Sequence, residues 1–284
     1  MATRNIFTVD LEEWFHICAS GNPALDPENW PSLPSRVELT TRLLLDMLDR
    51  LSIRATFFVV GWVAERHPEL IASVGAAGHE LGSHGYIHRK VYELGPDRFR
   101  DDLRASLRVL RSLGAGTVSR FRAPEWSINE RSLWALDTLA GEGIAVDASM
   151  APLRIVGDVR YPRYPHIRRT GAGPITEVPP LVANRFGQTM PLGWGWGLRM
   201  SAPRTVLKAI ERTNLAGAPA VLTIHPWEID PHPPRIALPR RLRFAHYFRL
   251  GGFYGRIGEI LRGAAFDRLD SVVASLPPGS LAAV

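Results

Sequence analysis

Residues 55–88 read ATFFVVGWVAERHPELIASVGAAGHELGSHGYIH and predict a strand, a helix and a second strand in close succession. Residues 55–60 are apolar apart from one threonine, which is typical of a strand buried on both faces. Residues 63–76 carry apolar side chains at helical spacing, and residues 80–83 form a short strand-like run that ends at His84. A strand, helix and strand in this order predict two parallel strands with the helix packed outside them.

The same alternation runs along the rest of the chain. Strands are expected at residues 6–9, 55–60, 80–83, 120–122, 144–147, 175–178 and 221–224. Helices are expected at residues 36–51, 63–76, 96–113, 129–139, 202–215 and 252–261, and a loop rich in Pro, Gly and Arg at 150–174. This pattern favours an α/β protein with a barrel or distorted barrel of seven strands over an open sheet. We expect residues 1–284 to form a single domain, with 235–284 as a C-terminal extension packed on it.

Composition narrows the class of protein. The chain of 284 residues has 34 basic and 28 acidic residues, for a net charge of +6. Its densest basic stretch, residues 235–249, mixes Arg with Leu, Phe, His and Tyr and carries no nucleic-acid recognition motif. We therefore expect no nucleic-acid partner; a solvated rim, an attraction for anionic substrates or contact with a membrane surface fits better.

The ends and the single cysteine add further expectations. Cys18 is the only cysteine, so no intramolecular disulfide can form, and a small buried or loop residue is the plain interpretation. The first residues contain no apolar leader, and no run of about 18 apolar residues occurs. We expect a cytoplasmic protein without a transmembrane span, which leaves peripheral membrane contact open.

Polar side chains stand at or just past the ends of five predicted strands. These residues are Asp10, His84, Arg122, Asp147 and His225. Because the carboxyl ends of the strands in a parallel barrel lie on one face, we expect these side chains to converge.

Two short motifs contribute the chemistry of this face. His84 and His88 have the i, i+4 spacing of imidazole pairs that bind zinc and related ions. Asp10, Glu12 and Glu13 follow an apolar strand, where carboxylates are costly unless they are paired or coordinated. Singly, each motif could be structural, as a helix cap, a core histidine or an ion pair. Together with Arg122 and His225, these motifs supply a metal site, a base, an orienting cation and an acid.

The sequence resembles the polysaccharide deacetylase family, which is carbohydrate esterase family 4 or NodB-like, and most of all its branch associated with exosortase and exopolysaccharide gene clusters. The stretches that carry the resemblance are TVDLEEWFH (8–16), ATFFVVGWVAERHPELI (55–71), GHELGSHGYIH (78–88), FRAPEWSI (121–128), VDASM (146–150), LTIHPWEIDPHPPRI (222–236) and RFAHYFRLGGFYGRIGEIL (243–261). The resemblance implies a distorted (β/α)7 barrel of the NodB-like type.

It also implies roles for single residues. Asp10 matches the catalytic base, Arg122 the arginine that pairs with it, and His225 the general acid, while Asp147 lies near the motif whose acid steers that histidine. Glu12, His84 and His88 match the ligands of one divalent ion, with Zn²⁺ favoured and Co²⁺, Mn²⁺ or Ni²⁺ as alternatives. Residues expected to contact the substrate are Trp14, Pro124, Glu125, Trp126, Trp194, Trp196 and Trp227.

The chain departs from the family pattern at two places. Many relatives have adjacent acids in the first motif, whereas Leu11 intervenes here, so that either Glu12 or Glu13 could be the ligand; we favour Glu12. Glu125 stands where many relatives carry an aromatic residue.

The resemblance implies a metal-dependent N-deacetylase that hydrolyses the acetamido group of an N-acetylated sugar in a polysaccharide, an oligosaccharide or a lipid-linked precursor. Two alternatives stay open. One is a deformylase or another small-molecule C–N hydrolase of the same fold. The other is a non-catalytic glycan-binding relic.

Overall fold

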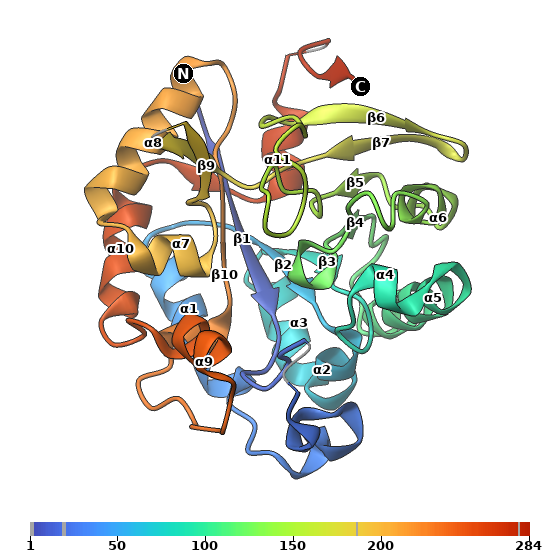
Figure 1. The fold of residues 1–284 in the computed structure, drawn as a ribbon, viewed down its shortest axis with the longest axis vertical. Coiled ribbons are helices and arrows are strands. Elements are labelled where there is room, and N and C mark those ends of the chain that lie inside the picture. Colours follow the sequence, from blue (N-terminus) through green and yellow to red (C-terminus); the bar gives the residue numbers. More distant parts are fainter. Residues whose placement is uncertain (1–2, 19–20, 186, 278) are drawn as a thin grey trace.

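The computed structural model describes residues 3–18, 21–185, 187–277 and 279–284. All seven predicted strands are present: β1 (Asn5–Leu11), β2 (Thr56–Val59), β3 (Glu80–Ser83), β4 (Arg120–Phe121), β5 (Val146–Asp147), β7 (Gly173–Glu177) and β10 (Val221–Ile224). They pair in the order β10-β1-β2-β3-β4-β5-β7, and each neighbouring pair is parallel. The predicted α/β class is confirmed, and Figure 1 shows the helices outside the strands.

The barrel is distorted where β7 and β10 would meet. β6 (His166–Thr170) pairs antiparallel with β7, β12 (Ala282–Ala283) adds to β6, and β11 (Phe266–Asp267) pairs with β1. A separate hairpin is formed by β8 (Val182–Arg185) and β9 (Gln188–Pro191). The Leu181 N–H donates to the Val221 carbonyl at 3.0 Å, and the Thr223 N–H donates to the Gly193 carbonyl at 2.6 Å. The residues that flank this hairpin, Leu181 and Gly193, therefore bond to β10 on the side of the barrel that a regular strand pair would close.

Helices cover the strands from outside (Figure 1). Their bounds are α1 (Val37–Arg50), α2 (Gly61–Arg66), α3 (Pro68–Ala76), α4 (Val91–Leu94), α5 (Pro96–Ser112), α6 (Ala135–Gly141), α7 (Gly195–Met200), α8 (Pro203–Leu215), α9 (Arg240–Tyr247), α10 (Phe253–Arg262) and α11 (Leu269–Ala274). In α5 the buried Phe99, Leu103, Leu107 and Leu110 repeat every three or four residues, which is the spacing of a helix that packs one face on a core. Among the described residues, no helix has the length and apolarity needed to cross a bilayer.

Three expectations about local structure were wrong. The helix expected at 63–76 is two helices, because Pro68 has no N–H to donate and holds the preceding His67 at a non-helical φ of −127°. The helix expected at 129–139 begins only at Ala135, after a turn in which the Ser132 hydroxyl donates to the Ser127 carbonyl at 2.7 Å. The loop expected at 150–174 contains β6, whose sequence HIRRT has no apolar alternation to reveal it.

Candidate active site at the carboxyl ends of the strands

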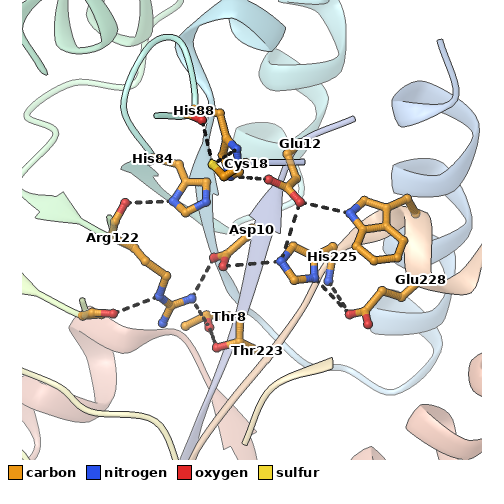
Figure 2. A network of polar contacts seen from close by, with 12 residues as sticks. Thr8, Asp10, Glu12, Cys18, His84, His88, Arg122, Thr223, His225 and Glu228 are labelled. Carbon is orange, nitrogen blue, oxygen red and sulfur yellow. Dashed lines mark hydrogen bonds and ion pairs between the residues drawn. The ribbon is translucent and has the colours of Figure 1, made fainter. Parts of the chain in front are cut away.

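A cavity of about 390 Å³ opens at the carboxyl ends of β1, β3 and β10. Asp10, Glu12, His84, His88 and His225 all line it, so these predicted site residues do converge. Figure 2 shows the Asp10 carboxylate joined by contacts to Arg122 on one side and to His225 on the other. Parallel strands account for this convergence, because their carboxyl ends, and the residues that follow them, lie at the same end of the barrel.

Glu12, His84 and His88 form a buried cluster whose potential ligand atoms all lie within 4.8 Å of one another. His84 Nδ1 contacts the Arg122 carbonyl at 2.8 Å, which leaves Nε2 as the nitrogen available to an ion. Burial lowers the pKa of His84 to about 4, so the imidazole is in the neutral form that coordinates metals. One carboxylate with two imidazoles suits a catalytic divalent ion, because further coordination positions are left for water and substrate.

The neighbours of these residues hold them in place. One Glu12 oxygen accepts a hydrogen bond from the Trp227 indole N–H at 3.0 Å, and the other lies 2.6 Å from His88 Nε2. The Cys18 thiol donates to the His88 carbonyl at 3.2 Å. Burial raises the pKa of that thiol, so Cys18 is a packing residue in the neutral form and not an activated nucleophile.

Glu13 points away from this cluster. Its carboxylate accepts hydrogen bonds from the Ser35 hydroxyl and from the Arg36 N–H at 3.0 Å. Because Arg36 precedes α1, Glu13 caps the positive end of that helix. The geometry therefore selects Glu12 over Glu13 as the residue that faces the two histidines.

Asp10 is fixed by Arg122, whose side chain is completely buried. Arg122 Nη1 donates to Asp10 Oδ1 and to the Thr8 hydroxyl, each at 2.8 Å, and Nε donates to the Ala148 carbonyl at 3.0 Å. With two acceptors on β1 and a third on the chain that follows β5, the guanidinium has one orientation, and it imposes that orientation on the carboxylate.

His225 lies across the cavity, with Nε2 3.9 Å from Asp10 Oδ2 and 3.6 Å from Glu12 Oε1. Its Nδ1 lies 3.1 Å from Glu228 Oε2, and its backbone N–H donates to the same oxygen at 3.0 Å. Burial alone would lower the pKa of His225, but the carboxylates of Glu12, Glu228 and Asp10 outweigh it and raise the pKa to about 9. The imidazole therefore carries a proton at neutral pH.

The expected place of Asp147 beside His225 is corrected by the structure. The Asp147 carboxylate contacts the Ser149 hydroxyl and the carboxyl group of Glu177, which accepts from the Met150 N–H at 3.0 Å. Burial raises the pKa of Asp147 to about 6 and that of Glu177 well above its usual value. The carboxylate at His225 Nδ1 belongs to Glu228 instead. The one available sequence signal was its position three residues after His225, across the turn that Pro226 begins.

Arg199 in α7 is a second residue that the sequence did not indicate. Its Nε lies 2.9 Å from Glu228 Oε1, and both side chains are buried. The same guanidinium donates to three carbonyls at the end of α9, those of Ala245 at 2.8 Å, His246 at 3.1 Å and Phe248 at 2.7 Å. His225 is thus connected through two buried side chains to the C-terminal part of the chain.

Tryptophans form much of the cavity wall. Trp126 and Trp194 stack with ring centres 5.3 Å apart, and Trp227 stacks on His225 at 5.2 Å. Trp196 also lines the cavity, and its indole N–H is buried with no hydrogen-bond acceptor among the described residues. An aromatic wall with an unused donor suits a ligand that has both apolar faces and oxygen atoms, as a sugar has.

The remaining predicted contacts divide into two groups. Trp14 and Glu125 line the cavity, although the Trp14 N–H is already bonded to the Pro34 carbonyl at 2.9 Å. Pro124 is buried and does not reach the cavity wall, which corrects that expectation. Glu125 and Trp126 both have positive φ, 57° and 54°, a conformation that costs non-glycine residues about 1–3 kcal/mol each. The two strained residues form the backbone bend that follows Arg122, and both line the cavity.

Two family profiles and several known proteins match parts of this chain. The sequence profile of the polysaccharide deacetylase family matches residues 32–142, and that of a domain of unknown function, DUF3473, matches residues 148–274. A peptidoglycan-N-acetylglucosamine deacetylase from Bacillus cereus is 27% identical over 119 residues, which are 38% of this chain and 43% of that protein. A chitooligosaccharide deacetylase from Bradyrhizobium is 33% identical over 98 residues, which are 34% of this chain and 42% of that protein.

The matched region thus spans less than half the length of these curated relatives. Among solved structures, a protein from Mycobacterium smegmatis assigned as a polysaccharide deacetylase has the same fold, with a TM-score of 0.62. It is 21% identical, and the match covers 98% of this chain and 91% of that one. Residues 32–142 thus match the polysaccharide deacetylase family, and the chain as a whole shares the fold of a solved structure that is assigned to it.

Proposed function

We propose that the protein is a metal-dependent N-deacetylase that hydrolyses the acetamido group of an N-acetylated sugar. The observation that carries this proposal is the buried Glu12, His84 and His88 cluster, with Asp10 and His225 3.9 Å apart beside it. Such a site offers a place for an ion, a base and an acid within reach of one amide bond. Because the curated relatives are a peptidoglycan-N-acetylglucosamine deacetylase and a chitooligosaccharide deacetylase, N-acetylglucosamine oligomers are the first substrates to try.

Glu12, His84 and His88 would hold the ion, and we propose Zn²⁺, although similar ligand sets accept Co²⁺, Mn²⁺ or Ni²⁺. When bound, a divalent ion of this kind polarises the amide carbonyl and lowers the pKa of water. The remaining chemistry belongs to side chains of the protein.

Asp10 is the base in this proposal, because its Oδ1 is occupied by Arg122 and its Oδ2 faces the cavity near His225. Arg122 holds that carboxylate in one orientation, and Oδ2 is left to take a proton from the attacking water. A positioned acid or base of this kind contributes roughly 10²–10⁴-fold to turnover.

His225 is the acid, because an amide can break only if the departing nitrogen receives a proton. The histidine is protonated at neutral pH, and Nδ1 is occupied by Glu228, so Nε2 is the atom that faces the cavity and donates. Glu228 and Arg199 position the imidazole and make no contact with the bond that breaks.

We further infer that the two matched segments have separate duties within one catalytic unit that spans the chain. His84, His88 and Arg122 lie in the segment that matches the polysaccharide deacetylase profile. Arg199, His225, Glu228 and α9 lie in the segment that matches DUF3473. In this proposal the first segment supplies the two metal-binding histidines and Arg122, and the second supplies the proton donor, while Asp10 and Glu12 precede both segments.

The test is the release of acetate from N-acetylglucosamine oligomers by the purified protein, with its metal content measured in the same preparation. We expect turnover to disappear on complete chelation and to return when Zn²⁺ is added. His84→Gln should lose both bound metal and activity, whereas His232→Gln, a change at an exposed histidine, should retain both. Full activity in metal-free protein, or binding of oligomers without turnover under all four ions, would contradict the proposal.

A further inference from the structure

Helix α9 contributes to two different cavities. Leu242, Ala245 and His246 line the catalytic cavity. Other residues of the same helix line a second, more open groove of about 620 Å³, bounded by Arg235, Ile236, Arg240, Arg243, Phe244, Tyr247 and Phe248, which we call the arginine groove. Figure 1 shows α9 beside α7, at the end of the barrel toward which β1 points. The arginine groove and the proposed active site are therefore separated by the width of one helix.

The charge of this region is one-sided. Residues 231–258 contain six arginines and no aspartate or glutamate. Arg235, Arg240 and Arg243 are exposed and form no ion pair with any described residue. Three guanidinium groups that face one groove without a carboxylate create a positive potential that attracts anions.

Some of the arginines of this region lie at the start of α9, where positive charge is electrostatically unfavourable unless an anion is bound nearby. Arg240, Arg241 and Arg243 stand in the first turn of the helix, where the first-turn acidic residues that many helices have are missing. The backbone N–H groups of that turn are a positive pole, and a cation there is disfavoured. Mutual repulsion of the guanidinium groups adds to this cost, and a bound anion would offset both terms.

The walls of the groove are aromatic and partly fixed. The Arg235 guanidinium lies 4.3 Å from the centre of the Tyr247 ring, whose hydroxyl accepts from the Ile236 N–H at 3.1 Å. Phe244 and Phe248 lie with ring centres 4.5 Å apart, and Phe244 is 51% exposed. Guanidinium groups bind carboxylates and phosphates through paired hydrogen bonds, and aromatic faces pack against sugar rings.

We propose that the arginine groove binds a carboxylate or phosphate group carried by the same glycan whose acetamido sugar enters the catalytic cavity. The proposal rests on the proposed function and adds a substrate class to it, an anionic oligosaccharide in place of a neutral one. A helix with its side chains is about 10 Å across, and a few linked sugars cover that distance. A chain that crosses α9 would therefore reach both cavities.

A glycan explains the groove better than a membrane surface does. A helix that rests on a bilayer presents a broad apolar face flanked by cations. In the arginine groove Phe244 is the one strongly exposed large apolar side chain among the described residues, and the arginines line a concave surface. This shape suits a chain that lies in the groove.

The experiment compares matched oligosaccharides on the metal-loaded protein. The anionic probes are oligomers of alternating glucuronic acid and N-acetylglucosamine, and N-acetylglucosamine oligomers with a terminal phosphate. The neutral probe is the unmodified oligomer of equal length. The variant Arg240→Gln/Arg243→Gln is set against Arg98→Gln/Arg108→Gln, which removes the same charge from exposed positions of α5.

We expect the Arg240→Gln/Arg243→Gln variant to raise KM for at least one anionic probe by about tenfold or more, which is the loss of roughly 1.4 kcal/mol of binding. kcat, and KM for the neutral probe, should stay unchanged, and the α5 control should resemble wild type. Equal effects on neutral and anionic probes, or equal effects of both variants, would overturn the proposal. So would loss of binding to anionic phospholipid vesicles in the variant without any change in the oligosaccharide constants.

Failure of this proposal can be told apart from failure of the proposed function. Turnover of the neutral probe without any preference for the anionic probes would support the proposed deacetylase function and contradict the proposed anion binding in the arginine groove. If no probe is turned over, calorimetric binding of the anionic probes decides the question, because affinity that depends on Arg240 and Arg243 supports the groove by itself. Absence of such binding overturns it.

Discussion

Glu228 lies between His225 and Arg199, 3.1 Å from the imidazole Nδ1 and 2.9 Å from the guanidinium Nε. Burial by itself would raise the pKa of Glu228, but Arg199 and His225 outweigh it and hold the pKa below its usual value. The carboxylate therefore stays ionised and fixes the imidazole with Nε2 toward the cavity. A histidine that is held and charged in this way is suited to give a proton to a leaving group.

The first prediction concerns the leaving group. Glu228→Gln should lower kcat for deacetylation of an N-acetylglucosamine oligomer on the order of 10²-fold, because the imidazole loses its orienting charge. Hydrolysis of 4-nitrophenyl acetate should fall much less, because that leaving group departs without a proton. The measurement is the ratio of the two kcat values in wild type and variant.

Glu211→Gln, at an exposed position of α8, serves as the control and should leave the ratio unchanged. If Glu228→Gln lowers both reactions by the same factor, the carboxylate has a structural role only, and its assignment as a positioning residue is wrong.

The second prediction concerns Arg199. Replacing it by Met leaves the Glu228 carboxylate buried without its partner, which we expect to cost about 3–5 kcal/mol of unfolding free energy. Arg199→Lys keeps the charge but cannot reach the three carbonyls of α9 with one ammonium group, so its loss should be smaller. Denaturant unfolding of both variants measures the order.

We call the kcat for the N-acetylglucosamine oligomer divided by the kcat for 4-nitrophenyl acetate the amide-to-ester ratio. In Arg199→Lys this ratio should fall as it does in Glu228→Gln, because α9 and Glu228 are no longer held together. A ratio equal to that of wild type, in a folded Arg199→Lys protein, would show that the connection from α9 to His225 is without effect on the acid.

How much of this could be read from the sequence depends on how local each interaction is. The seven barrel strands follow from apolar runs such as 55–60, and the convergence of Asp10, His84 and His225 follows from where those runs end. Strand β6 could not be predicted, because its pairing with β7 is decided by tertiary contacts and not by an alternating pattern.

The site residues differ in the same way, because some have a local sequence signal and others depend on tertiary contacts. His84 and His88 carry a spacing that points to a metal, whereas Arg199 is one arginine among many and becomes informative only once α9 packs against α7. Glu228 was visible in the sequence next to His225, yet Asp147 was placed in the orienting role by resemblance to the family. In the structure the Asp147 carboxylate contacts Ser149 and Glu177, and the carboxylate beside His225 is that of Glu228.

The third prediction uses the Trp196 indole N–H, which is buried in the cavity wall without an acceptor among the described residues. If a substrate oxygen accepts from it, Trp196→Phe should raise KM about 2–10-fold, which is the worth of one neutral hydrogen bond. The unfolding free energy should change little by comparison, because no protein acceptor is lost. Trp134→Phe, a change at a tryptophan that packs against Phe99, should leave KM unaltered. A Trp196→Phe protein with wild-type KM would exclude this contact.

The fourth prediction concerns Asp147, whose pKa burial raises to about 6 from the 3.8 of an ordinary aspartate. Because the folded protein holds this proton more tightly than the unfolded chain, the proton stabilises the fold at low pH. That contribution is lost as the pH rises from about 4 through about 6. Asp147→Asn has no such proton to lose. The unfolding free energy of Asp147→Asn minus that of wild type should therefore increase by about 2–3 kcal/mol as the pH rises from 4 to 7.

Turnover gives the second readout for the same variant. Asp147 does not touch His225, so the amide-to-ester ratio of Asp147→Asn should match that of wild type, in contrast to Glu228→Gln. A lowered ratio in Asp147→Asn would return the orienting role to Asp147, and a stability difference that is constant with pH would mean that this carboxyl group titrates normally in the fold.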